Sequence, residues 1–196
     1  MKYLFLLCII LSTFFTSAQK IRFTDSRNQW TTYFVYHDNA PMVATFKYYT
    51  DTFAFGRYYK QLRSNTNFYY CSGVPCPGVI SGGPRNFLIR EDTVVGKVYY
   101  RDISTLSTDI LEHLLYNYNC ALGDTASFGG LIDTVVSIDS ILVGGVYHKV
   151  IGMKNFTYGR NYFAVEGVGC TNGPLFPAYF GFEWNESLIC FSQSGI

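Results

Sequence analysis

Short runs of aromatic and β-branched residues, separated by turn-forming residues, recur along the whole sequence. Residues of these types suit a pleated, half-buried surface, and Gly, Asn, Asp and Pro interrupt them at intervals of roughly 8–12 residues. That spacing is typical of antiparallel sandwiches and barrels. The sequence therefore predicts an all-β fold, an antiparallel sandwich or barrel-like meander. The predicted strands are Trp30–His37, Met42–Thr50, Thr52–Tyr59, Phe68–Cys71, Asn86–Arg90, Lys97–Arg101, His113–Cys120, Thr134–Ile138, Ile141–Val143, Val146–Met153, Phe163–Gly167 and Ser187–Phe191.

One segment favours a helix. Ser107–Leu115 starts with hydroxyl residues that can cap a helix, but it is short and runs into a tyrosine-rich strand. We expect at most one short helix, of about two turns.

The first 18 residues have the three parts of an export signal. A Lys at position 2 precedes an apolar run from Tyr3 to Phe15, and Thr16 and Ala18 occupy the −3 and −1 positions of a cut before Gln19. The run is shorter than the roughly 20 residues of a membrane-spanning helix, and no later segment predicts a span. We expect a cleaved signal peptide at 1–18 and one domain at 19–196, exported to the periplasm, the cell surface or the medium.

The charge of the mature chain is balanced. The sequence has 15 basic and 14 acidic residues, and removal of Lys2 equalises them. Without a basic stripe, we expect neither a nucleic-acid partner nor an anionic membrane surface.

The aromatic residues form doublets, such as Tyr48-Tyr49, Tyr58-Tyr59, Tyr69-Tyr70 and Tyr99-Tyr100. Strand alternation directs one member of each doublet to the core and the other outward. Outward tyrosines either bind a glycan or a protein, or stabilise the sheet by cross-strand packing.

Five cysteines follow the predicted cleavage site. In an oxidising compartment we expect disulfides, first between Cys71 and Cys76, which enclose a short loop with Pro and Gly, and second between Cys170 and Cys190. The spacing of Cys71 and Cys76 does not fit a redox C-x-x-C motif. Cys120 lies in an apolar run, so we expect a buried, inert thiol.

A weak repeat links two segments 88 residues apart, Asp51–Tyr59 and Asp139–Tyr147. Each has Asp, a hydroxyl residue, an apolar run, a glycine (Gly56 or Gly144) and a tyrosine. We expect two β-hairpins, in which the Asp satisfies backbone groups where the strand starts and the glycine occupies the turn. The alternative makes Asp51 and Asp139 a calcium or catalytic pair, but they lack flanking oxygen ligands at alternating positions.

An ordered set of motifs spans Trp30 to Ile196. They are Phe87–Asp92, Lys97–Arg101, Leu114–Tyr118 followed by Gly123–Thr125, Ile138–Gly145, Glu166–Gly169 and Leu188–Gln193. Together they resemble a large family of uncharacterised secreted bacterial β proteins, whose members often carry a C-terminal type-nine secretion sorting domain. The resemblance implies a secreted or surface-displayed β domain and no catalytic residues. The chain differs from that pattern at Asn117 and at Ala164-Val165, and no sorting tail follows Ile196, so it could also be an accessory part of a longer exported protein.

The sequence carries no clear catalytic pattern. His37, His113 and His148 stand apart, no serine lies in a Gly-x-Ser-x-Gly elbow, and no glycine-rich run opens a helix. We therefore expect no cofactor and no metal. Glu166 is the acidic residue to examine first, although a structural carboxylate is the favoured interpretation. The preferred hypothesis is a non-catalytic binding or display module; the alternative is a glycan or peptide hydrolase that uses Glu166 and a second carboxylate or a histidine.

Overall fold

The computed structural model describes residues 20–35, 41–70, 78–103, 111–128, 131–155, 159–175 and 185–193. These residues form antiparallel strands, as the sequence predicts. The strands are β1 (Asn28–Val35), β2 (Pro41–Ala54), β3 (Arg57–Tyr70), β4 (Gly78–Asp92), β5 (Lys97–Asp102), β6 (His113–Asn117), β7 (Thr125–Phe128), β8 (Leu131–Val143), β9 (Val146–Asn155), β10 (Arg160–Val165), β11 (Gly169–Cys170) and β12 (Asn185–Gln193).

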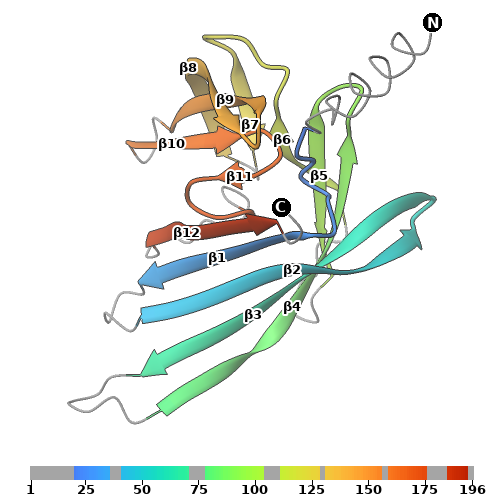
Figure 1. The fold of residues 1–196 in the computed structure, drawn as a ribbon, viewed down its shortest axis with the longest axis vertical. Coiled ribbons are helices and arrows are strands. Elements are labelled where there is room, and N and C mark those ends of the chain that lie inside the picture. Colours follow the sequence, from blue (N-terminus) through green and yellow to red (C-terminus); the bar gives the residue numbers. More distant parts are fainter. Residues whose placement is uncertain are drawn as a thin grey trace, which may run out of the picture.

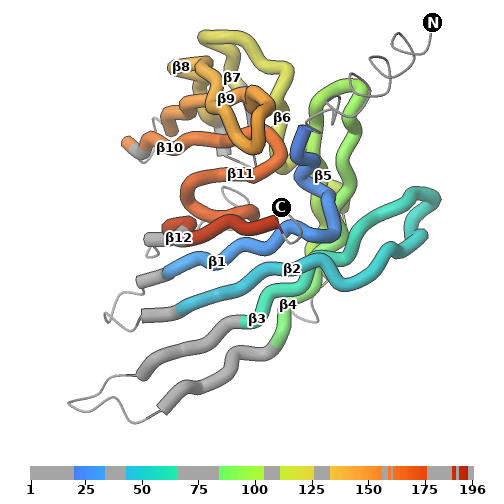
Figure 2. Tube along the Cα trace, viewed as in Figure 1, coloured from blue at the N-terminus to red at the C-terminus, as the bar shows by residue number. Residues whose placement is uncertain are grey.

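The strands form two sheets (Figure 1). The larger sheet has the order β12-β1-β2-β3-β4-β5-β6 and curls into a half-barrel, and the smaller has the order β11-β10-β9-β8-β7. Nearly all neighbours are consecutive in the chain. The exception is β12, the last strand, which pairs with β1, the first (Figure 2). The sequence therefore predicted the all-β meander correctly, although it could not show that the first and last strands pair.

The smaller sheet is hydrogen-bonded to both edges of the larger one. At the β12 edge, Leu188 N–H donates to the Thr171 carbonyl at 2.8 Å. Beyond the β6 edge, Lys149 Nζ on β9 donates to the Tyr118 carbonyl at 2.8 Å and to the Cys120 carbonyl at 2.9 Å. Buried side chains from both sheets form one hydrophobic cluster, so the two sheets share a core.

Trp30 lies at the centre of that core. Its side chain is fully buried on β1, and the rings of Phe23, Tyr48 and Phe191 have centroids 5.2, 5.8 and 5.7 Å away. The indole N–H donates to the carbonyl of Val168, in the turn between β10 and β11, at 2.6 Å. One side chain thus connects the first strand of the large sheet to a turn of the small sheet.

Buried tyrosines connect loops to the sheets in the same way. Tyr116 donates its hydroxyl to the Pro174 carbonyl at 2.8 Å, and Tyr118 donates to the Val165 carbonyl at 3.3 Å. Burial raises the pKa of both phenols well above its usual value, so each remains a neutral donor. The first doublet alternates as expected, with Tyr48 packed against the core and Tyr49 67% exposed; in the second, Tyr58 is 77% exposed and Tyr59 is buried on the side of the sheet away from the core.

Residues 20–27 precede β1 and lie between the sheets. Phe23 is fully buried, and carboxylates from both sheets hold the segment beside it. Lys20 forms an ion pair with Glu166 at 2.7 Å, and Thr24 donates its hydroxyl to Glu91 at 2.9 Å. The expected signal peptide at 1–18 lies outside the described residues.

The two expected hairpins are present. Phe55 and Gly56 connect β2 to β3 with φ of 52° and 74°, and Gly144 and Gly145 connect β8 to β9 with φ of 57° and 81°. Two consecutive positive φ values define a type I′ turn, which matches the twist of paired strands. The predicted run Thr52–Tyr59 is thus divided by a turn.

The two hairpins are out of phase by one residue. The repeat aligns Gly56 with Gly144, but Gly56 is the second turn residue of its hairpin and Gly144 the first. A shift of one residue changes which face each later side chain occupies. Tyr59 is 2% exposed beside Glu112 and Arg101, whereas Tyr147 is 68% exposed, so the repeat does not give two equivalent halves.

The expected helix Ser107–Leu115 is absent from the described part of that segment. Leu111 and Glu112 have no regular structure, and β6 begins at His113, which pairs with Tyr100 of β5. A helix this short is marginal in isolation, and pairing with β5 gives the same backbone groups partners within a sheet. Residues 104–110 lie outside the described part.

Substitution of Gly167 tests the packing of residues 20–27. Gly167 has φ of 81°, and a Cβ there would overlap the backbone carbonyl of Ile21. We expect Gly167→Ala to lower the free energy of unfolding by about 3 kcal/mol or more, from backbone strain and displacement of the segment. Urea unfolding followed by far-UV circular dichroism measures this loss.

Gly123 supplies the matched control. Its φ is 87°, and no atom lies within 4 Å of a Cβ built there. Gly123→Ala therefore costs only the backbone strain, about 1 kcal/mol. Equal losses in the two variants would contradict the close approach of residues 20–27 to Gly167.

Candidate functional site

The cysteine predictions have different outcomes. Cys71 and Cys76 lie outside the described residues, so their bridge stays a prediction. Cys120 is a free, buried thiol whose Sγ lies 3.1 Å from the Asn117 carbonyl. Burial raises the pKa of this thiol, which keeps it protonated and unreactive.

The expected Cys170–Cys190 bridge is wrong for this structure, in which neither of the two cysteines forms a disulfide. Cys170 is fully buried on β11. Cys190 is exposed on β12, because the next residue, Phe191, packs against Trp30 and alternation directs Cys190 to the opposite face. The two strands lie close together, but the two side chains occupy different sides of the large sheet.

Glu166 lies in the turn after β10 and holds other segments in place. Its Oε2 pairs with Lys20 and accepts the backbone N–H of Lys149 at 3.3 Å. Its backbone carbonyl lies 2.9 Å from Nδ1 of His148, which is fully buried and whose Nε2 finds no hydrogen-bond partner in the described part of the chain. These contacts match the structural interpretation of Glu166. His37 lies outside the described residues.

Asp51 and Asp139 lie on different sheets, and each bonds within its own hairpin, so the structure gives no support for the alternative calcium or catalytic pair. Asp51 lies inside β2 and pairs across the hairpin with Lys60 at 2.7 Å, so its predicted role at the start of a strand is wrong. Asp139 lies inside β8 and accepts the backbone N–H of Ser140 at 2.8 Å. Across the described residues, no cluster of three or more His, Cys, Asp or Glu could hold a metal ion.

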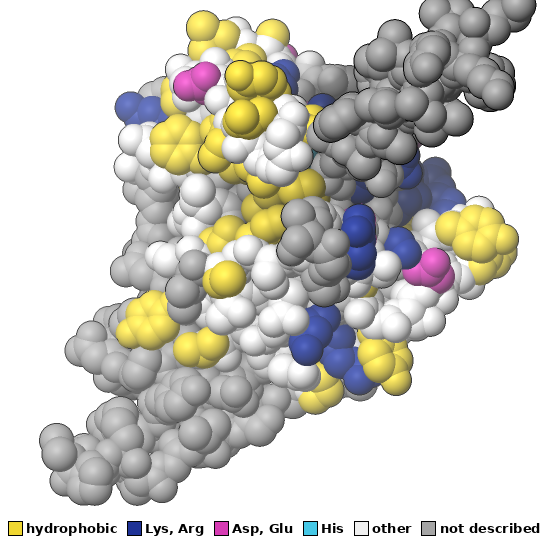
Figure 3. Space-filling model, in the orientation of Figure 1, with side chains coloured by type: hydrophobic (Ala, Val, Ile, Leu, Met, Phe, Trp, Pro, Cys, Tyr) yellow, Lys and Arg dark blue, Asp and Glu magenta, His cyan; other side chains and the backbone are white. Residues whose placement is uncertain are grey.

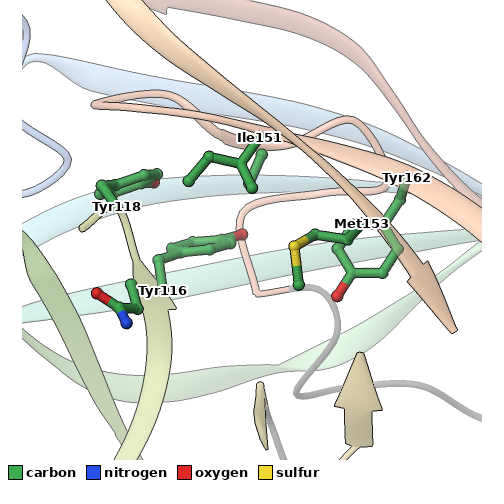
Figure 4. A pocket seen from close by; sticks show the side chains of 7 residues that line it. Tyr116, Tyr118, Ile151, Met153 and Tyr162 are labelled. Carbon is green, nitrogen blue, oxygen red and sulfur yellow. The ribbon is translucent and has the colours of Figure 1, made fainter. Parts of the chain in front are cut away.

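One gap in the described part of the interior lies between β6 and the strands β9 and β10 (Figure 4). The labelled side chains Tyr116, Tyr118, Ile151, Met153 and Tyr162 surround a gap with no room for a water molecule. This region is therefore a packed core and not a binding cavity.

A buried polar network lies next to that gap. Asp133 is fully buried and accepts the Tyr162 hydroxyl at 2.7 Å and the Asn155 amide at 2.8 Å. Burial and the carboxylate raise the pKa of Tyr162, so its phenol stays a donor. The network connects β8, β9 and β10 from within.

A shallow hollow of about 330 Å³ lies on the outer side of the small sheet. Gly152 lies beneath it, between Ser137 and a half-exposed Phe163, and Lys154 and Asn161 also line it. It is broad and open, with few convergent polar groups, and therefore differs from an ordinary ligand pocket.

The outer side of the large sheet carries arginines next to aromatic rings. Residues directly opposite each other in an antiparallel ladder point to the same side. The buried pair Leu62 and Phe87 points to the core side of the sheet. Side chains alternate along each strand, so the pairs Arg63 with Asn86 and Arg90 with Tyr99 point to the outer side. We call this surface the arginine–aromatic face; its members are Tyr49, Phe55, Arg57, Tyr59, Arg63, Arg90, Tyr99 and Arg101.

Guanidinium groups lie over rings along this face. Arg63 is 4.3 Å from the ring centre of Tyr49, Arg90 is 4.2 Å from that of Tyr99, and Arg101 is 4.3 Å from that of Phe55. Such cation–π contacts stabilise a guanidinium over the ring. The arrangement holds planar donors and exposed rings side by side on a sheet, which is a rigid support for recognition.

Glu112, which directly precedes β6, bonds to three residues of the arginine–aromatic face. Its carboxylate accepts hydrogen bonds from Arg57 at 2.7 Å, Arg90 at 2.9 and 3.2 Å, and the Tyr59 hydroxyl at 2.7 Å. Partial burial opposes the charged form, but the hydrogen bonds from Arg90 and Tyr59 and the arginine charges outweigh it, so the pKa of Glu112 lies below its usual value. The face thus already holds one carboxylate of its own chain.

The free end of the β2–β3 hairpin carries exposed aromatic residues: Phe55 of the arginine–aromatic face lies in the turn, and Phe53 and Tyr58 form a pair on the other side of the ladder. Phe53 is 64%, Phe55 55% and Tyr58 77% exposed, and the rings of Phe53 and Tyr58 have centroids 4.9 Å apart. Figure 3 shows hydrophobic side chains projecting at this end, with basic side chains close by. Large apolar residues gathered at an exposed tip indicate an interaction surface.

The arginine–aromatic face was not predicted from the sequence. The segments Arg57-Tyr58-Tyr59 and Tyr99-Tyr100-Arg101 place arginine beside tyrosine doublets, and that signal was available. The position of Glu112 was not, because it is 55 residues from Arg57 and 22 from Arg90 along the chain.

Comparison with known proteins gives no family model, no curated protein and no solved structure that matches the chain. Within the described segments, no helix has the length and apolar character to cross a bilayer.

The pH dependence of stability tests the Glu112 contacts. A carboxyl whose pKa falls on folding adds stability above its unfolded-state pKa, near 4.5, and loses it as the pH drops through the folded-state value. We expect Glu112→Gln to cost about 1–3 kcal/mol at pH 7. The difference from wild type should shrink as the pH falls below about 4.5.

Asp51→Asn is the control, because Asp51 is largely exposed in its ion pair with Lys60. An exposed pair contributes little, so this variant should stay within about 0.5 kcal/mol of wild type at each pH. Urea unfolding between pH 3 and 7 measures both variants. A Glu112→Gln loss that is constant or increases towards low pH would contradict the account.

Proposed function

We propose that this chain is an exported, non-catalytic β module that binds a glycan through the arginine–aromatic face and the tip of the β2–β3 hairpin. The observation that carries the proposal is the backbone of Phe55. Its φ is 52°, a positive value that bulky residues rarely adopt, and the turn position that it occupies favours Asn or Gly. Strain of this kind, about 1 kcal/mol, is concentrated at sites of function.

The side chain of Phe55 supports this proposal. The ring is 55% exposed and lies under the guanidinium of Arg101, so the turn displays it and does not bury it. A phenylalanine gains little stability from such exposure. A ligand that covers the ring would supply the missing stabilisation.

Exposed aromatic rings on a rigid sheet suit sugar binding. Aromatic side chains offer large contact area at low conformational cost, and the arginine donors beside them can bind hydroxyl or acidic groups. The resemblance to secreted bacterial β proteins and the N-terminal export pattern support an extracellular ligand.

A hydrolase centred on Glu166 has less support. The Glu166 carboxylate pairs with Lys20 and accepts a backbone N–H, so catalysis would require these contacts to break. A binding role needs no such rearrangement of the arginine–aromatic face.

Substitution of Phe55 by Asn separates binding from folding. Because Asn accepts a positive φ readily, we expect Phe55→Asn to raise the free energy of unfolding by about 0.5–1 kcal/mol. The same variant should lose glycan binding, measured as the signal of the mature protein on a glycan array. A gain in stability together with a loss of binding is the specific signature of a strained recognition residue.

Phe163→Ala is the matched control, because Phe163 is a half-exposed ring on the small sheet, outside the arginine–aromatic face. This variant should keep the array signal. The proposal fails if the wild-type protein gives no signal on the array, or if Phe55→Asn binds as well as wild type.

A further inference from the structure

Basic and acidic residues are nearly equal in number in the sequence, but the fold places them on different surfaces. Opposite residues in the β2–β5 ladders show that Lys47 and Lys97 share the outer side with the four arginines of the arginine–aromatic face. In the described residues, the carboxylates on that side are Asp92 and Glu112. A chain with almost no net charge therefore presents one basic surface, and such surfaces attract anionic partners.

The other two carboxylates of the large sheet discussed above either lie on its core side or pair with a basic residue outside the arginine–aromatic face. Glu91 faces inward and accepts a hydrogen bond from Thr24, and Asp51 pairs with Lys60 across the hairpin. These acidic groups do not neutralise Lys47 or Arg63, which lie opposite each other on the outer side of β2 and β3. The basic surface and the exposed rings therefore coincide.

Building on the proposed function, we propose that the ligand of the arginine–aromatic face is an acidic polysaccharide, a sugar chain that carries carboxylate or sulfate groups. The contacts of Glu112 show the chemistry: two arginines and a tyrosine hydroxyl surround a carboxylate at hydrogen-bond distance. Guanidinium groups match planar anions in a bidentate manner. Exposed rings such as Tyr49 and Phe55 add apolar contacts for the sugar faces.

A nucleic acid would also meet basic residues and aromatic rings. We favour the polysaccharide, because the export pattern of residues 1–18 predicts a protein outside the cytoplasm, where nucleic acid is not the expected partner.

The test measures binding of the mature protein to polygalacturonate, dextran sulfate, neutral dextran and single-stranded DNA by calorimetry at two salt concentrations. We expect binding to one or both acidic polysaccharides, with no binding to neutral dextran and weaker binding to DNA. The two acidic polymers distinguish carboxylate from sulfate recognition. Tenfold more salt should weaken the interaction at least tenfold, because exposed charges are screened.

The double variant Lys47→Gln/Arg63→Gln removes two adjacent charges from the face, and we expect roughly tenfold weaker binding at low salt. Arg22→Gln, which changes an exposed arginine of the segment between the sheets, should bind as wild type. Equal binding by the double variant, or preference for DNA, overturns the inference. Binding to neutral dextran alone overturns it and leaves the proposed glycan function intact, whereas binding to none of the polymers overturns both.

Discussion

The burial of Trp30 with its indole N–H bonded to Val168 is the constraint on which the rest of the structure depends. A half-barrel sheet buries only one side, and the small sheet must cover that side without leaving buried polar groups unpaired. Trp30 meets both needs, because its ring packs on Phe23, Tyr48 and Phe191 while its nitrogen satisfies a turn carbonyl of the small sheet. Tyr116 and Tyr118 repeat this solution with their hydroxyls.

Polar side chains in the interior and on the outer surface have different roles. Glu91 and Glu166 hold the segment before β1, and Asp133 connects the strands of the small sheet, so these carboxylates serve the fold. The arginines lie on the outer side of β3, β4 and β5, where contacts with aromatic rings stabilise their positions. The long β2–β3 ladder continues to the turn and holds Phe55 in a conformation that the isolated residue disfavours.

Local patterns predicted the local structure. Runs of β-branched and aromatic residues gave the strands, and Gly56 and Gly144 gave the turns, since both depend on neighbours in the chain. The phase of the strands and the pairing of distant strands could not be predicted from the sequence. The one-residue offset between the hairpins changes the environment of Tyr147. The placement of Cys170 and Cys190 on opposite sides depends on the pairing of β12 with β1. Net charge also gave no sign of the basic surface, because strand alternation separates charges that composition sums.

The stability of Trp30→Phe tests the central claim most directly. Phenylalanine keeps most of the apolar contact but leaves the Val168 carbonyl without its donor. The account predicts a loss of about 2–3 kcal/mol in the free energy of unfolding, together with faster hydrogen exchange in β1 and in β10 alike, because the two sheets share one core. A variant as stable as wild type, or faster exchange confined to one sheet, would contradict it.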